Sequence, residues 1–563
     1  MAGKTRINLL QAFSITQFSS RSLRYIILLC VCMGAATVFA QRKTDTTGKV
    51  PVNLKGARTL EVVQTDSGDI TKLLGDVALV QGETSMFCDS AYLNVAKNNV
   101  EAFGNVRVLQ PGSEGQSDYM RYVGNQKLAF MKGNVMLTDG KSHLWSEELT
   151  YNTATKVGVY TQGGTLQDST TTLSSNAGTY DTRTKDSRFT GEVIVTDPQY
   201  EIVSDDMGYN TETKIVTFYA PSVVTSDSSV LRTSCGTYDT KNELAHFTCR
   251  SSILNKEQYV EADKIDHNRK TGIGKATGNV IAIDTIQHTT LYCGNADFNE
   301  KKKTMLATIK PVLKQVNDKD SLFIRADTFY SAPIPRPGDT ETIKKTITKK
   351  NKKGKKEIVT EQVPVDTVAA DSSRPRYFIG YHHVLIFSDS LQGKCDSISY
   401  TQKDSVMRMM YDPIVWSRKS QITGDTILLY TDSSKIKKIY VPNNAFVASQ
   451  SGPDKAGLFD QVQGKTLTGY FKDGNIDYML VKPDAQTIYY AKDEHDAYLG
   501  VNQVTSLRMK VYFKDQSIHR IIYEQDVKSK MTPLNKADLP GMKLSRFKWL
   551  PELRPKSKEQ LFE

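Results

Sequence analysis

The chain has 563 residues, of which 39% are hydrophobic and 27 are tyrosine, and its formal net charge is +11. This length is enough for two or more domains, and the composition is typical of a folded, strand-rich protein and excludes a largely disordered one. The positive charge is uneven, because eight lysines fall between Lys344 and Lys356, so it does not indicate a nucleic-acid-binding surface.

The N-terminus has the parts of an export signal. Arg21 and Arg24 precede a short apolar run, Tyr25 to Phe39, which ends Val38-Phe39-Ala40 at a small-residue cleavage site before Gln41. The run is shorter than the about 20 apolar residues that a membrane-spanning helix needs. The sequence therefore predicts a signal peptide at residues 1–40 and an exported mature chain, and a retained anchor helix is the alternative.

A ~29-residue repeat organises the chain from Gly75 to about Ile283. From Asp89, steps of one repeat reach a column of acidic or small polar residues, namely Asp118, Glu147, Asn176, Asp205, Ser234 and Asp263. Four positions later stands a second column, namely Leu93, Tyr122, Tyr151, Tyr180, Tyr209, Tyr238 and His267. A third column opens Gly-Asn-Val triplets at Gly104, Gly133 and Gly278. Such self-similarity predicts stacked units that complete their core only with their neighbours.

Each unit is predicted to contain two strands and two turns. Segments such as Val193-Ile194-Val195 are β-branched, and no stretch between residues 60 and 330 has a helical period. Tyr-Asn-Thr-x-Thr-Lys segments and Gly-Asn-Val triplets are interpreted as the turns.

The two side-chain columns have structural interpretations. The acidic column is expected outside or at a turn, because a buried row of like charges is costly. The tyrosine column is interpreted as a packing ladder rather than a ligand-contacting row, with members Tyr122, Tyr151, Tyr180, Tyr209 and Tyr238. Whether the two columns share a face stays open at this point.

Shifts in composition divide the rest of the chain. The predicted segments are a flexible lead-in at 41–59, a repeat domain at 60–335, a lysine-rich linker at 336–375, a second, divergent domain at 376–525 and a tail rich in proline and aromatic residues at 526–563. The linker is interpreted as a solvated spacer or inserted loop, with contact to lipid phosphates as the alternative. The tail is expected to dock as an extended segment, on this chain or on a partner.

The cysteines do not have metal-binding spacing. The mature chain keeps Cys88, Cys235, Cys249, Cys293 and Cys395. Cys235 and Cys249 could pair across one hairpin, or pack as small residues within the sheet.

No specific catalytic motif is present in the sequence. The eight histidines lack metal-ligand spacing, and we find neither a nucleophile elbow nor a phosphate-binding loop. A carboxylate repeated in every unit indicates a structural repeat rather than a single site, so we predict a protein that is not an enzyme and that needs no cofactor or metal.

The Gly-Asn-Val triplets, the small-Asp-x-x-x-Tyr segments and the constant repeat length behind a signal peptide resemble the OstA-like family of lipopolysaccharide-transport proteins, which is related to LptA. The resemblance is strongest over residues 60–330 and weaker over 377–525. It implies an all-β fold, a repetitive antiparallel β-jellyroll open along one side, here in two consecutive segments. It also implies a place in the periplasm or against the outer membrane. The implied partners are lipopolysaccharide, LptC- and LptD-like proteins that pair through sheet edges, and further copies of the chain joined end to end.

The resemblance and the alternation of the strands together indicate an apolar groove for acyl chains. Each methylene removed from water contributes about 0.8 kcal/mol, so a dry groove needs no polar site to hold them. The candidate groove residues are Val77, Leu79, Val106, Val108, Val135, Leu137, Val193, Val195, Val280 and Ala282. The alternative is that this face closes into an ordinary core.

The function that we expect is therefore a non-enzymatic lipid-binding bridge that carries lipopolysaccharide to the outer membrane. One alternative is a structural β-solenoid scaffold of the envelope or surface, and another is a carbohydrate-active β-helix enzyme. Strand order separates the first two, since a solenoid with one rung per repeat would place Asp89 and Asp118 on adjacent strands, about 4.8 Å apart.

Overall fold

The computed structural model describes residues 52–65, 68–316, 321–335, 340–350, 356–366, 374–432, 435–472, 475–495, 497–514 and 517–563. The predicted signal peptide and most of the predicted lead-in lie outside the described residues. The end of the lead-in, predicted to be flexible, forms strand at residues 53–56. No helix within the described ranges combines the length and apolar character needed to cross a membrane.

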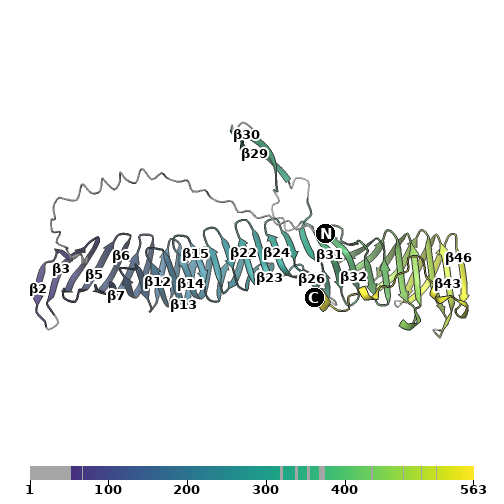
Figure 1. Ribbon diagram of the computed structural model, residues 1–563, viewed down its shortest axis with the longest axis horizontal. Helices are drawn as coiled ribbons and strands as arrows, with labels where there is room; N and C mark the ends of the chain where they lie inside the picture. The colour runs from purple at the N-terminus through teal and green to yellow at the C-terminus, as the bar shows by residue number, and fades with distance from the viewer. Residues whose placement is uncertain are drawn as a thin grey trace, which may run out of the picture. The chain divides into compact units, whose positions relative to one another are not determined.

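Residues 54–563 form one unit, in which strands follow one another in chain order along a stack (Figure 1). The first strands are β1 (Asn53–Gly56), β2 (Thr59–Val63), β3 (Ile70–Gln81), β4 (Thr84–Asn94), β5 (Asn99–Gln110), β6 (Ser113–Val123), β7 (Leu128–Thr138) and β8 (Ser142–Asn152). Next come β9 (Val157–Tyr160), β10 (Gly164–Asp168), β11 (Thr171–Ser175), β12 (Ala177–Asp181), β13 (Asp186–Asp197), β14 (Tyr200–Asn210), β15 (Ile215–Phe218), β16 (Ser222–Ser226), β17 (Ser229–Thr233), β18 (Gly236–Asp239), β19 (Leu244–Phe247), β20 (Ser251–Asn255), β21 (Gln258–Ala262), β22 (Lys264–Asn268), β23 (Ile273–Asp284), β24 (Thr289–Asn299), β25 (Thr304–Thr308), β26 (Val312–Val316), β27 (Ser321–Arg325) and β28 (Thr328–Pro333).

The second half of the stack follows a hairpin made of β29 (Thr340–Lys350) and β30 (Lys356–Asp366). Its strands are β31 (Arg376–Phe387), β32 (Gln392–Thr401), β33 (Val406–Met410), β34 (Ile414–Ser417), β35 (Ser420–Thr423), β36 (Thr426–Asp432), β37 (Lys435–Val441), β38 (Ala445–Gln450), β39 (Phe459–Gly464), β40 (Thr466–Lys472), β41 (Asn475–Lys482), β42 (Ala485–Lys492), β43 (Tyr498–Ser506), β44 (Arg508–Lys514), β45 (Ser517–Glu524) and β46 (Lys528–Pro533). Short 3-10 turns are η1 (Asp454–Ala456), η2 (Leu534–Lys536), η3 (Leu539–Gly541), η4 (Pro551–Leu553) and η5 (Glu559–Leu561).

The predicted all-β, antiparallel fold is confirmed. Strands β3, β4, β5 and β6 each pair antiparallel with the next, and β3, β5 and β7 start one repeat apart, at Ile70, Asn99 and Leu128. One repeat is therefore two strands. Because β5 separates the strands that carry Asp89 and Asp118, a stack with one rung per repeat is excluded.

The Gly-Asn-Val triplets were predicted to be turns, and this prediction is wrong. They are bulges within long strands. In β5 the pairing with β6 shifts between Phe103 and Val106, and the skipped residues, Gly104 and Asn105, both have positive φ, 71° and 46°. Two successive left-handed residues redirect a strand without ending it, which local sequence alone does not distinguish from a reverse turn. The strand therefore bends at a corner, and its two halves belong to two arms of the fold.

The two halves of the chain share one sheet. Strand β31 pairs with β27, through Ile324 and Ile386, and with β28, through Phe329 and Gly380. The segments 60–335 and 376–525 are therefore consecutive parts of a single stack, and residues 336–375 are inserted between paired strands.

The predicted lysine-rich linker contains strands that we did not predict. β29 and β30 pair antiparallel and form a separate two-stranded sheet (Figure 1). The physical reason lies in β-branched blocks such as Thr346-Ile347-Thr348, which stands between two lysine pairs and favours a strand even in a segment with high charge.

The predicted tail begins with β46, which pairs with β43, and then folds back along the stack until Leu561 packs against Val312 and Phe323 of the first half. Gln461 accepts the backbone N–H of Leu544 and donates to the carbonyl of Met542, both at 2.8 Å. Gln421 bonds the backbone of Lys548 and Leu550 in the same way, at 2.8 and 2.9 Å. We call residues 534–563 the strap. It docks on this chain, which is one of the two outcomes that the sequence left open.

Candidate functional site

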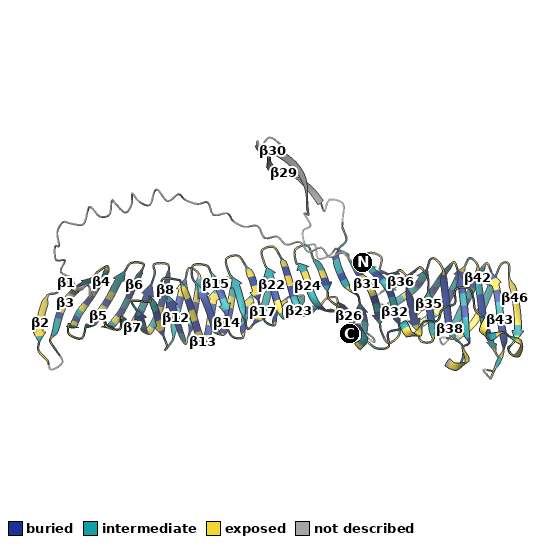
Figure 2. Cartoon of the chain, in the orientation of Figure 1, coloured by how far each residue is buried: buried dark blue, intermediate teal, exposed yellow. Residues whose placement is uncertain are grey.

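The corner divides the strands into two arms that enclose an apolar interior. The valine arm contains strand halves such as 106–110 and 113–117, and the tyrosine arm contains halves such as 99–103 and 119–123. Buried and exposed residues alternate along both arms (Figure 2). One face of each arm therefore turns toward the other.

All ten candidate groove residues lie on the inner face of the valine arm. Nine are buried, with exposed fractions from 0% at Val193 to 8% at Ala282, and Val108 is half-buried against the same cluster. The cluster extends into the second half of the stack, where it includes Val447 and Val511. These side chains therefore face the interior, and their contact with acyl chains stays a prediction.

The tyrosine ladder lies on the inner face of the opposite arm. Tyr151, Tyr180 and Tyr209 are buried, and Tyr122 and Tyr238 are half-buried, in the same interior cluster. Asp118 is exposed although it precedes Tyr122 by an even number of residues, because the bulge shifts the pairing between Gln116 and Tyr119. The bulge therefore places the acidic and tyrosine columns on different faces, which the sequence could not decide.

Side chains of the two arms meet across the interior. A methyl group built on Gly158 of the tyrosine arm would lie 3.1 Å from Leu137 of the valine arm. A methyl group built on Gly115 of the valine arm would likewise lie 3.1 Å from Met131 of the tyrosine arm. In these repeats side chains fill the space between the arms. An acyl chain can therefore occupy the interior only after the arms move apart.

Asp139 joins the arms at the margin opposite the corner, which we call the mouth. Its carboxylate accepts hydrogen bonds from Lys185 Nζ at 2.6 Å and from the Tyr180 hydroxyl at 2.9 Å, both on the tyrosine arm. It also accepts the backbone N–H groups of Lys141 and Ser142. Only 3% of the Asp139 side chain is exposed.

These contacts shift pKa values in opposite directions. Burial alone would raise the pKa of Asp139, but the hydrogen bonds from Lys185, Ser142, Lys141 and Tyr180 lower it overall. The pKa of Tyr180 is raised, chiefly by burial and also by the nearby Asp139 carboxylate. The carboxylate therefore stays charged across the mouth at neutral pH.

The next repeat has the same arrangement. Asp168 accepts hydrogen bonds from Lys214 Nζ and, at 3.1 Å, from the Tyr209 hydroxyl, and 6% of its side chain is exposed. One repeat earlier, Lys156 Nζ donates to the side-chain carbonyl of Gln110 at 2.6 Å, so a neutral amide replaces the carboxylate.

These mouth contacts were not predicted from the sequence, although a signal for them was present. The lysines recur once per repeat, and each bonds a residue 46 positions earlier. A partner at that distance is recognisable only once the bent strands and the mouth are known.

The acidic column closes the corner. Asn105 donates to Asp89 at 2.9 Å, and Asn134 donates to Asp118 at 2.7 Å. Asn279 and Asp263 repeat this contact at 2.7 Å. The carboxylates thus accept from the asparagine of the bulge, which explains why both columns recur with one period.

Replacing Gly133 by alanine should lower the free energy of unfolding more than replacing Gly140. Both glycines have positive φ, 74° and 86°, so both variants should lose about 1–2 kcal/mol through backbone strain. The new methyl group at Gly133 would also lie 2.6 Å from Asp118 Oδ2. A methyl group at Gly140 would have no atom within 4 Å beyond its chain neighbours. Chemical denaturation followed by circular dichroism measures the difference, and equal losses would contradict a close contact at the corner.

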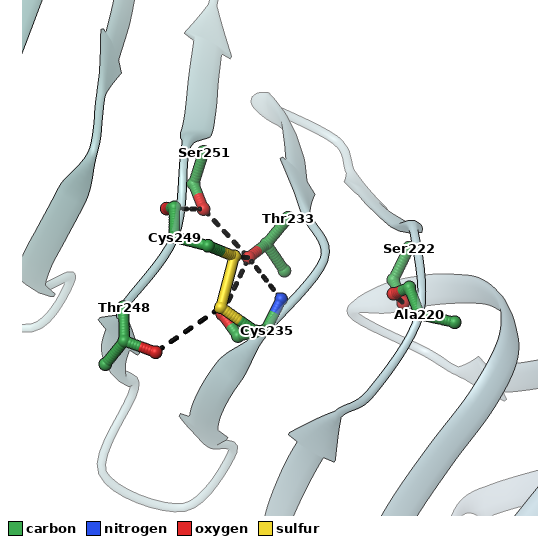
Figure 3. Close-up of a disulfide and its surroundings, with 7 residues drawn as sticks. All are labelled: Ala220, Ser222, Thr233, Cys235, Thr248, Cys249 and Ser251. Carbon is green, nitrogen blue, oxygen red and sulfur yellow. Dashed lines mark hydrogen bonds between the residues drawn. A yellow bond between two sulfur atoms is a disulfide. The ribbon is translucent and has the colours of Figure 1, made fainter.

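Cys235 and Cys249 form a disulfide at a corner without the acidic residue (Figure 3). The acidic column has Ser234 there, and the glycine column has Cys249. The sulfurs join positions flanking the β18–β19 hairpin, with Cα atoms 5.9 Å apart. The sequence allowed these cysteines either to pair or to pack as small residues, and in the structure they pair.

The fold and interior define an antiparallel β stack whose bent strands enclose an apolar interior with a polar mouth. Residues 49–205 match the family model described as OstA-like protein, which confirms the predicted family resemblance over this segment. Among solved structures, the chain is similar to LptH from Pseudomonas aeruginosa, described as the LptA-homologous periplasmic component of the lipopolysaccharide transport device. That match has 15% identity and a TM-score of 0.20, and it covers 25% of this chain and 95% of LptH. A search of curated proteins found no match.

Proposed function

We propose that this chain is an exported, non-enzymatic carrier that binds lipopolysaccharide and moves it toward the outer membrane. The observation that carries this proposal is the match of residues 49–205 to OstA-like proteins. The continuous apolar cluster between the arms supports it, because hydrocarbon chains need a dry surface and no polar partner. The acyl chains occupy this interior when the arms part, and the candidate groove residues contact them.

A location outside the cytoplasm is supported by the disulfide, since such bonds persist in oxidising compartments such as the periplasm. The partners are LptC- and LptD-like proteins that pair with the terminal strands, or further copies of the chain joined end to end. The side chains of Leu60 and Val62 on β2 are exposed, 53% and 56%, as in a strand that awaits a partner.

A second candidate function is a structural scaffold of the envelope. The packed interior favours it, because contacts such as Leu137 with Gly158 are those of an ordinary core. The antiparallel pairing rules out the one-rung solenoid form of that scaffold.

Photo-crosslinking separates the two functions. A benzophenone amino acid at Val108, half-buried on the inner face, should crosslink to lipopolysaccharide when the protein is irradiated in its own envelope. The matched control places the same group at Phe87, which is 41% exposed and pairs with Arg107 beside Val108. Labelling at Val108 alone supports the carrier. Equal labelling at both positions, or no labelling at Val108 in a folded protein, would contradict the carrier and favour the scaffold.

A further inference from the structure

The mouth is closed by ion pairs at two successive repeats. In each pair the aspartate follows or ends a strand of the valine arm, β7 or β10, and the lysine belongs to a turn of the tyrosine arm. The carboxylates are almost fully buried, whereas Lys185 and Lys214 retain 25% and 30% exposure. The pairs therefore cover the interior and keep one side toward solvent.

The neighbouring repeats differ in charge at the same two positions. On one side the offset of 46 residues joins Lys156 to the neutral Gln110. On the other side it relates Glu243 to Asp197, which are both acidic, and Glu243 instead lies 4.0 Å from Arg269. Among these four successive repeats of the described chain, the middle two therefore hold the ion pairs.

We propose that Asp139–Lys185 and Asp168–Lys214 are latches that hold the two arms together over this part of the interior, and that an apolar chain enters it only when they separate. The inference rests on the proposed function, because it concerns access to the same interior. It adds the side chains that control access and the margin at which the arms part.

Burial explains why the latches depend on both partners. A buried ion pair contributes little net stability, but a carboxylate that loses its ammonium partner is left uncompensated in a poorly solvated place. Without Lys185, Asp139 keeps only the Tyr180 hydroxyl and two backbone N–H groups, and it regains water if the mouth opens. Losing the lysines should therefore open the mouth rather than only weaken the fold.

The test measures how fast a reagent reaches the interior. Leu166 is 1% exposed on the inner face of β10, two residues before Asp168. We would introduce Leu166→Cys in the mature chain with Cys88, Cys293 and Cys395 replaced by alanine, and follow its reaction with N-ethylmaleimide. The double variant Lys185→Met and Lys214→Met should react about 100-fold faster, because each of the two lost charge-assisted hydrogen bonds favours the open state about tenfold.

The matched control is Lys132→Met, which removes an exposed ion pair of the tyrosine arm. Lys132 Nζ lies 2.7 Å from the Glu148 carboxylate, and the Lys132 side chain is 64% exposed. Its rate should equal that of the parent. If the double variant fails to fold, Tyr180→Phe with Tyr209→Phe removes only two hydroxyl donors and should still accelerate the reaction.

Unchanged rates in folded latch variants, or equal acceleration by the control, would overturn the proposal. The labelling contains no lipid, so its failure leaves the crosslinking result at Val108 untouched. Conversely, faster labelling without any crosslink would reject the carrier and keep the latches.

Discussion

Replacing Val193 by aspartate should lower the free energy of unfolding by about 3–5 kcal/mol, the cost of a buried charge without a partner. Val193 is fully buried, directly follows the bulge in β13 and lies in the interior cluster. The new carboxylate would pair with no mouth lysine, since the side chain follows the corner rather than the mouth. Chemical denaturation of the mature chain, followed by circular dichroism, measures the loss.

Ile194 provides the matched control. It is the next residue of the same strand, but it points to the outer face and is 43% exposed. Ile194→Asp should therefore cost about 1 kcal/mol or less, the range of strand propensity at a solvated site. Similar losses in the two variants would mean that the interior is as wet as the outer surface, which would contradict both the apolar core and its proposed use for hydrocarbon.

Deleting the strap, residues 534–563, should expose the outer face of the valine arm in the second half of the stack. Leu458, Ile488, Tyr490 and Val501 are buried there against residues of the strap. Each large apolar side chain that becomes exposed should cost about 1.5–3 kcal/mol. The truncated chain should therefore melt at a lower temperature and bind an apolar dye such as anilinonaphthalene sulfonate.

The strap also satisfies polar groups, which makes a milder variant informative. Gln421→Leu with Gln461→Leu keeps the apolar contacts but removes four hydrogen bonds to the strap backbone. It should weaken docking, at about 1–3 kcal/mol for each backbone group left buried and unpaired. A synthetic strap peptide added to the truncated chain should reverse dye binding. Absence of dye binding after truncation would show that other residues cover this face.

Much of the architecture was predictable because it is local and repeated. The alternation in segments such as Val193-Ile194-Val195 predicts strands, and the recurrence of one pattern at a constant spacing predicts a stack. The inward-facing positions, from Val77 to Ala282, follow from the same alternation. The Gly-Asn-Val triplets were assigned the wrong geometry, because two left-handed residues are compatible with both a turn and a bulge.

The sequence by itself determined an all-β chain of antiparallel pairs with one apolar face, since strand propensity and alternation act over a few residues and were repeated in every unit. Only the tertiary structure decided that Asn134 reaches Asp118 at the corner, that Lys185 reaches Asp139 across the mouth and that the strap covers the outer face of its own chain. Those contacts depend on how sharply each strand bends and how closely the two arms approach, and no short stretch of sequence contains that information.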